Sequence, residues 1–212
     1  MNKMNHYSLL RQTRREAVSD TVLAAAEQVI ARKGYDGATM QDIANASGCA
    51  AGTLYLYFKT KDELFNAMAA KHSQALSQRL SAAVKSSADP LKKLRSRYET
   101  FIHYMNEHPV YFRIFYTAAP TGRATLQASL RGTARRIYRR QRQAEVHILK
   151  QAQAARQIRH DLRVEELVEF LHGVSSTASA RWSTSARAPS MREQLRLLWE
   201  VIRSILKVKE AR

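Results

Sequence analysis

Hydrophobic residues recur at steps of three and four along most of the chain, the spacing of one face of an α-helix. The first such stripe runs from about Arg14 to Lys33 and stops at Gly34, a residue that ends helices by adopting a positive φ. Further helices are predicted after Thr39 and over about 61–83, 90–107, 124–156, 164–182 and 191–207. With only 7 Gly and 4 Pro in 212 residues, the pattern predicts an all-α fold.

Several helix starts carry their own signal. A hydroxyl residue followed three positions later by an acid is typical of a capped N-terminus, and four pairs have this spacing: Thr13/Glu16, Thr39/Asp42, Thr60/Glu63 and Ser190/Glu193. Asp89 followed by Pro90 predicts a fifth start, because proline suits the first turn of a helix.

One short segment, Leu54–Phe58, alternates as a strand would. A single strand of this length would find no partner, whereas a helix of about two turns would place Leu54 and Phe58 on one inward face. The preceding Ser47-Gly48-Cys49 reads as a tight turn. Two short helices joined by this turn and braced by the first helix predict a helix-turn-helix.

The stretch Thr39–Leu64 resembles the DNA-binding segment of the TetR/AcrR family of bacterial transcriptional repressors. The positions that carry the resemblance are Thr39, Ile43, Ala44, Ala46, Gly48, Gly52, Thr53, Leu54, Tyr55, Tyr57, Phe58, Lys61 and Leu64. It covers roughly the first 65 residues; the remainder agrees with the family in length and predicted helix count.

The resemblance implies a helix-turn-helix DNA-binding domain over 1–60, a connecting helix over 61–84, and a helical effector-binding and dimerisation domain over 85–212. It implies a homodimeric regulator that binds a palindromic double-stranded DNA operator and is released by a small-molecule effector, apolar or anionic. No enzymatic activity, cofactor or metal is expected. A cytoplasmic protein, associated with the nucleoid when bound to DNA, is expected, without a membrane partner.

The resemblance also assigns DNA contacts. Thr39 and Thr53 would offer hydroxyls to phosphates, and Tyr55 and Tyr57 would place phenol groups at the backbone. Lys61 would pair with a phosphate, and Gly52 would let the helix approach the duplex closely.

Three positions depart from the family pattern. Ala50 stands where a capping serine is common, Ala51 where a polar or basic residue is common, and Leu56 where a polar or aromatic residue is common. We therefore hypothesise that sequence is read by apolar contact with thymine methyl groups and by DNA shape.

The net charge of +17 indicates a polyanionic partner, but it is unevenly distributed. Residues 1–60 hold seven Lys and Arg against five acids, so only +2 lies there. Arg11, Arg14 and Arg15 could contact phosphates or form a solvated face.

Arginines are also dense on the predicted helix over 124–156. Arg131, Arg135, Arg139 and Arg142 share one predicted face, and Arg136 and Arg140 flank it. This row is interpreted as a solvated face, as a site for an anionic effector such as an acyl-coenzyme A, or as a surface for secondary DNA contacts.

An aromatic group in the second part suits both a core and a ligand pocket. The predicted ligand-binding residues are Tyr98, Phe101, Tyr104, Phe112, Phe115 and Tyr138, with Gln141 and His147 as polar members. Each polar residue could equally be a satisfied core residue.

The last two helices suggest a four-helix dimer interface, with burial inside one subunit as the alternative. The predicted helix over 164–182 carries small residues at helical spacing, and the predicted helix over 191–207 carries a broad apolar stripe. The predicted interface residues are Gly173, Ser176, Thr177, Ala180, Leu195, Trp199 and Ile202.

Two other functions are alternatives to this interpretation. A DNA-binding protein of architectural type, unresponsive to ligands, would use the basic second part for extended contacts. An enzyme would need a nucleophile with its base, a phosphate-binding loop or a metal motif, and none is evident. Cys49 is the only cysteine, which excludes an internal disulfide.

Overall fold

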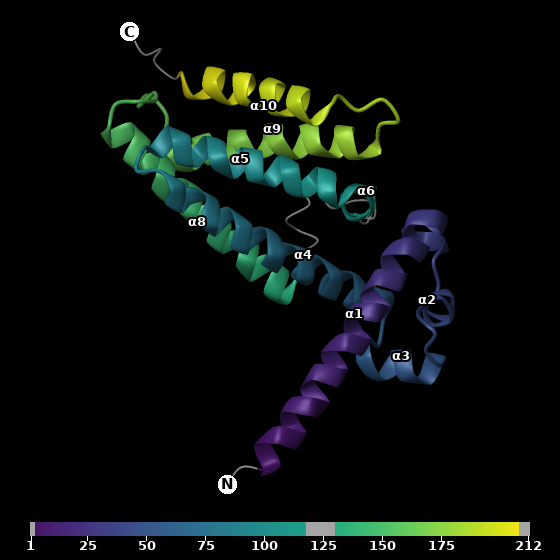
Figure 1. Ribbon diagram of the computed structural model, residues 1–212. Helices are drawn as coiled ribbons and strands as arrows, with labels where there is room; N and C mark the ends of the chain where they lie inside the picture. Colours follow the sequence, from purple (N-terminus) through teal and green to yellow (C-terminus); the bar gives the residue numbers. More distant parts are fainter. Residues whose placement is uncertain (1–2, 118–129, 208–212) are drawn as a thin grey trace. The chain divides into compact units, whose positions relative to one another are not determined.

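The computed structural model describes residues 3–117 and 130–207, and throughout these ranges the regular elements are helical. The chain divides into two compact units, Met1–Ala69 and Ala70–Arg212. The division falls inside one helix, α4 (Figure 1).

The first unit contains α1 (Lys3–Gly37), α2 (Met40–Ser47), α3 (Ala51–Tyr57) and the beginning of α4 (Lys61–Ala83). Its core is apolar and fully closed to solvent: each of the four helices contributes side chains with no exposed surface, among them Val22, Ala26, Ile43, Ala44, Leu54 and Leu64. Residues 54–57 lie in a helix, as predicted.

Helix α1 differs from its predicted bounds. It begins at Lys3, so Thr13 lies inside the helix and its hydroxyl donates to the backbone oxygen of Leu9 at 3.0 Å. The prediction of a start at Thr13 was wrong because a threonine can bond back to the preceding turn as readily as it can cap. Gly34 interrupts the helix with φ of 75°, where the sequence predicted its end.

The other predicted starts are present. Thr39 and Asp42 form a reciprocal capping box at α2. The hydroxyl of Thr60 accepts from the backbone N–H of Glu63, and the Asp89 carboxylate accepts from the first turn of the helix that begins at Pro90. Each cap satisfies donors that a helix end leaves without a partner.

The second unit is a helical bundle. It contains the rest of α4, a 3₁₀ turn η1 (Val84–Ser86), α5 (Pro90–Glu107), α6 (Pro109–Thr117), α8 (Gly132–Ala154), α9 (Val164–Thr184) and α10 (Met191–Leu206). Helix α5 packs against α8 and α10, and α9 packs against α6, α8 and α10 (Figure 1). The start predicted near Ala124 lies outside the described residues; within them, Leu130 and Arg131 are not helical and α8 begins at Gly132.

Across the part of the chain that the structure describes, no helix combines the length and apolar character needed to cross a membrane. Nor do His, Cys, Asp or Glu side chains gather there in threes as a metal ion would require.

Candidate DNA interface and ligand cavity

Helix α3 is held to the first unit by one face and leaves the other free. Leu54 and Phe58 are buried, whereas Leu56 is 72% exposed and Tyr55 is 45% exposed. The turn before it is closed by Gly48, which takes φ of 69° and donates its N–H to the oxygens of Ala44 and Asn45. This turn orients α3 so that its exposed face is available to a partner.

The N-terminus of α3 has no side-chain cap. Ala50 occupies the capping position in an extended conformation and makes no side-chain hydrogen bond. Together with Gly52, which is also exposed, it leaves the first turn of α3 open to close approach by a ligand or a nucleic acid. Free N–H groups at a helix N-terminus favour an anionic partner.

Cationic side chains near α3 differ in what they contact. The Arg15 guanidinium lies over the Tyr57 ring, 5.9 Å from its centroid, and so fixes α1 beside the end of α3. Lys33 is paired with Asp42 at 2.6 Å. Hydrogen bonds from Lys33 and Thr39 lower the pKa of Asp42 to about 2, so this capping carboxylate stays ionised.

Lys61 closes the junction between α1 and α2. Its Nζ donates to the backbone oxygens of Tyr35 at 2.5 Å, Ala38 at 3.0 Å and Asp36 at 3.3 Å. It also lies 4.6 Å from the centroid of the Tyr35 ring. The Tyr35 hydroxyl donates to Asp62; burial and this bond raise the pKa of Tyr35.

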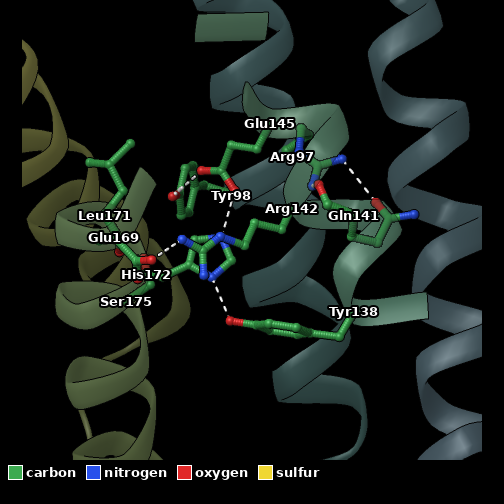
Figure 2. A network of polar contacts seen from close by, with 10 residues as sticks. All are labelled: Arg97, Tyr98, Tyr138, Gln141, Arg142, Glu145, Glu169, Leu171, His172 and Ser175. Atoms are coloured by element: carbon green, nitrogen blue, oxygen red, sulfur yellow. Dashed lines mark hydrogen bonds and ion pairs between the residues drawn. The ribbon is translucent and has the colours of Figure 1, made fainter. Parts of the chain in front are cut away.

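The second unit contains a cavity of about 210 Å³. Aromatic and aliphatic side chains of α4, α5, α6 and α8 form most of its wall: Leu76, Leu80, Tyr98, Phe101, Tyr104, Tyr111, Phe112, Phe115, Tyr116, Ile137 and Tyr138. Polar residues also line the cavity, among them Arg97, Gln141, Glu145 and His172, which Figure 2 shows near one another. The other polar lining residues are His72, Ser73, Ser77, Ser175 and Ser176. The cavity can therefore enclose an apolar molecule and form hydrogen bonds to a polar group on it.

Glu145 is the centre of the polar part of the wall (Figure 2). Its side chain is buried, and its two oxygens accept from the Tyr98 hydroxyl at 2.7 Å and from His172 Nε2 at 2.8 Å. Burial by itself raises the pKa of Glu145, but the hydrogen bond and charge of His172, the charge of Arg97 and the Tyr98 bond together lower it. A carboxylate held in this way is ionised.

The network continues to the cavity through His172. Its Nδ1 lies 2.9 Å from the Tyr138 hydroxyl oxygen. Nε2 donates to the carboxylate in either protonation state, whereas Nδ1 accepts from the Tyr138 hydroxyl when the ring is neutral and donates to its oxygen when the ring is charged. Burial raises the pKa of Tyr98 and also that of Tyr138, so both phenols stay protonated.

One segment of the chain matches a known protein family. The sequence model of the family described as "Bacterial regulatory proteins, tetR family" matches residues 22–68, the segment from the core of α1 to the first turns of α4. Residues 22–68 therefore match the DNA-binding domain of the TetR family.

Curated relatives agree with this assignment. An uncharacterised HTH-type transcriptional regulator of Mycobacterium tuberculosis is 26% identical over 111 residues, which is 52% of this chain and 55% of that protein. The fatty acid metabolism regulator protein of Bacillus subtilis is 33% identical over 73 residues, 34% of this chain and 38% of that protein. The chain thus spans about half or less of the length of these relatives.

Solved structures share the fold over most of the chain. FadR from Bacillus halodurans has a TM-score of 0.78 at 16% identity, covering 91% of this chain and 97% of that one. FadR from Bacillus subtilis, solved in complex with stearoyl-CoA, has a TM-score of 0.75 at 18% identity, covering 90% and 98%. These relatives and neighbours are regulators rather than enzymes.

The predicted DNA contacts lie within or beside the matched segment, on α3 and at the helix ends next to it. Ala50, Gly52, Tyr55 and Leu56 are exposed, and Ala51, Thr53 and Tyr57 are half-buried. Thr39 is exposed, but its hydroxyl already serves the α2 cap. Lys61 already donates to three carbonyl oxygens. Their roles at phosphates stay predictions.

The cavity brings together most of the predicted ligand-binding residues, namely Tyr98, Phe101, Tyr104, Phe112, Phe115, Tyr138 and Gln141. His147 is exposed, lies outside the wall and contacts Gln151. Sequence reasoning missed Arg97, Glu145 and His172. The available signal was the single acid at 145 within an arginine-rich helix, with an arginine and a histidine in neighbouring helices.

The predicted interface residues differ in how far they are exposed. Gly173 and Thr177 are exposed, whereas Ile202 has no exposed surface and Ser176 lines the cavity. Ala180, Leu195 and Trp199 are half-buried. The interface assignment of Ile202 is therefore corrected, because its stripe faces the bundle interior. Phe170 and Val201, 54% and 43% exposed, are apolar residues on free faces of α9 and α10.

The arginine row is mostly solvent-exposed. Arg135, Arg136, Arg139 and Arg140 are exposed, and Arg131 precedes the helix. Arg142 is the exception, since it is half-buried and pairs with Glu169 of α9 (Figure 2).

Replacing Lys61 with methionine is expected to lower the free energy of unfolding by about 1.5–3 kcal/mol, because three carbonyl oxygens lose a charged donor. Urea unfolding of the variant measures this. The exposed Lys59, whose side chain makes no such contact, provides the matched control as Lys59→Met. An unchanged stability in the Lys61 variant would contradict the structural role. The salt dependence of operator binding reports the phosphate role separately, since each lost phosphate contact reduces the slope by about 0.9.

Proposed function

We propose that this protein is a homodimeric, DNA-binding transcriptional regulator, a repressor that leaves a palindromic operator when a small molecule enters the second unit. The observation that carries the proposal is the exposed face of α3 in a capped helix-turn-helix. Such a helix fits the major groove, and a dimer places two of them about one helical turn of DNA apart.

The exposed face of α3 supports reading by apolar contact. Leu56 is largely exposed, and the exposed Ala50 and Gly52 contribute no polar side chain to the same helix end. Thymine offers the one methyl group that the major groove presents, so an apolar side chain discriminates it from the other bases. Phosphate contacts from Thr53, Tyr55 and Tyr57 would fix the register without reading sequence.

The cavity supports a largely apolar effector. Its wall is mainly aromatic and aliphatic, and it lies wholly within the second unit. A solved structure with the same fold holds stearoyl-CoA, a molecule with a long apolar chain. The exposed apolar side chains Phe170 of α9 and Val201 of α10, together with the exposed Gly173 and Thr177 of α9, support dimer formation through these two helices.

Selection of binding sites from random DNA with the full-length protein is expected to return a near-palindrome whose half-sites contain A·T pairs at the positions facing Leu56. Gel shifts with thymine replaced by uracil, which lacks the methyl group, should then weaken binding by about tenfold or more, since each altered base pair costs about 1–3 kcal/mol.

Two results would contradict parts of this proposal. G·C-rich half-sites recognised through guanine contacts would rule out reading by thymine methyl groups. Equal binding to arbitrary sequences would favour a DNA-binding protein of architectural type over an operator-specific regulator. Expression of a reporter gene placed behind the selected operator would show whether the protein represses or activates transcription. We expect repression.

A further inference from the structure

Arg97 is a buried cation in the wall of an apolar cavity. It lies on α5, is 7% exposed, and reaches α8 through two hydrogen bonds. Its guanidinium donates to Gln141 Oε1 at 3.0 Å and to the Gln141 backbone oxygen at 3.2 Å. Both acceptors are neutral.

A guanidinium carries five N–H donors, and these two bonds leave donors unused. Within the described residues, no carboxylate accepts a hydrogen bond from Arg97. Glu145 lies on the same wall and acts on Arg97 by its charge, but its oxygens accept from Tyr98 and His172. The negative charge of Glu145 therefore balances the positive charge of Arg97, but some N–H donors of Arg97 have no acceptor in the described part of the chain.

Gln141 adds a donor beside the guanidinium. Because its Oε1 accepts from Arg97, the orientation of its amide group is fixed and Nε2 is the donor end. Nε2 donates to the Ser77 hydroxyl at 2.6 Å, which uses one of its two N–H bonds. Arg97 of α5 and Gln141 of α8 thus supply unused donors in a cavity that Phe101 and Ile137 also line.

We propose that the cavity selects an apolar molecule that carries an oxygen acceptor at one end, a carboxylate or an ester or thioester carbonyl, bound by Arg97 and Gln141. The acceptor would complete the guanidinium's hydrogen bonds, and the apolar body would fill the aromatic part. An apolar amine of the same length would bring an ammonium group to a buried cation and be rejected. The inference rests on the proposed function in one respect, because it takes this ligand to be the effector that releases the protein from DNA.

Isothermal titration of the full-length protein, without DNA, tests the inference with three probes of matched chain length: decanoate, methyl decanoate and decylamine. The wild type is expected to bind both acceptor probes at least tenfold more tightly than decylamine. Tighter binding of decanoate than of the methyl ester would identify a carboxylate as the preferred acceptor, and the reverse order would identify a neutral carbonyl.

Arg97→Met is expected to weaken binding of the acceptor probes by about 10- to 100-fold, the range for loss of charged hydrogen bonds, and to leave decylamine no weaker. Gln141→Met, which retains the cation, serves if the Arg97 variant does not fold, and should weaken the acceptor probes by a smaller factor. Phe101→Leu is the matched control, since it changes the apolar wall and should affect all three probes alike.

Equal affinity of the wild type for decanoate and decylamine, absence of binding by all three probes, or an equal effect of Arg97→Met on every probe would overturn the inference. Operator selection is an independent measurement. Acceptor-selective binding by a protein that fails to select an operator would overturn the proposed function and leave this inference standing.

Discussion

Replacing Glu145 with leucine is expected to lower the free energy of unfolding by about 3–5 kcal/mol, because removal of one buried ionic partner leaves the others uncompensated. The Tyr98 hydroxyl and His172 Nε2 would lose their acceptor, and Arg97 would lose the charge that offsets it. Since domains are stable by only about 5–15 kcal/mol, urea unfolding should show a large shift in midpoint.

A second carboxylate near the same pair of helices provides the control. Glu169 pairs with Arg142, but its side chain is 63% exposed (Figure 2). Exposed ion pairs contribute about 0–1 kcal/mol, so Glu169→Ala should change stability little. If the two variants lost stability equally, burial of Glu145 would not be the cause.

The same carboxylate predicts a dependence on pH. Its folded-state pKa is lowered from the ordinary value of 4.5, so ionised Glu145 stabilises the fold above about pH 4.5. That contribution is lost as pH falls through the lower folded-state value. The stability difference between the wild type and Glu145→Gln should therefore shrink below pH 4.5, which unfolding curves at several pH values would measure.

In α3, Leu54→Ala is expected to cost about 2–5 kcal/mol of stability, while Leu56→Ala should leave stability within about 0.5 kcal/mol. The two leucines are separated by one residue, but Leu54 has no exposed surface and Leu56 is 72% exposed. The alanine at 54 would leave a cavity between α3 and the rest of the first unit, whereas the alanine at 56 would only remove surface.

Operator affinity should show the opposite order, with the larger loss in Leu56→Ala and the smaller loss in folded Leu54→Ala. Leu56→Ala is expected to weaken binding by about tenfold or more, since both half-sites of a dimeric complex lose a base contact. Gel shifts with the selected operator, at a temperature where both variants are folded, provide the measurement. Unchanged affinity in the Leu56 variant would show that another residue reads the DNA.

The first unit could largely be predicted from sequence because its signals are local. A hydroxyl and an acid three residues apart define the start of α2, and Gly48 marks the turn after it. The same logic failed at Thr13, where no glycine or proline stops the helix from extending back to Lys3. Whether a threonine caps a helix or lies within it depends on the residues before it.

The polar part of the cavity could not be predicted, because its contacts join residues far apart in the chain. Glu145 and His172 are 27 positions apart, and Arg97 and Gln141 are 44 apart. Periodicity can show that one face of α8 is turned inward, but not which distant side chain meets it. His147 was predicted for the pocket, yet two residues along a helix reverse the direction of a side chain, so Glu145 is inside and His147 outside.

The wall of the cavity is divided between helices in a way that bears on how its specificity can change. Tyr111, Phe112, Phe115 and Tyr116 all belong to the single short helix α6, whereas Arg97, Gln141 and Glu145 belong to α5 and α8. Substitutions in α6 can therefore alter the size and shape of the apolar body that is accepted while the polar residues stay in place. Selection, in nature or in the laboratory, could retune such a sensor to new molecules of one chemical class by varying nine consecutive residues, Pro109–Thr117.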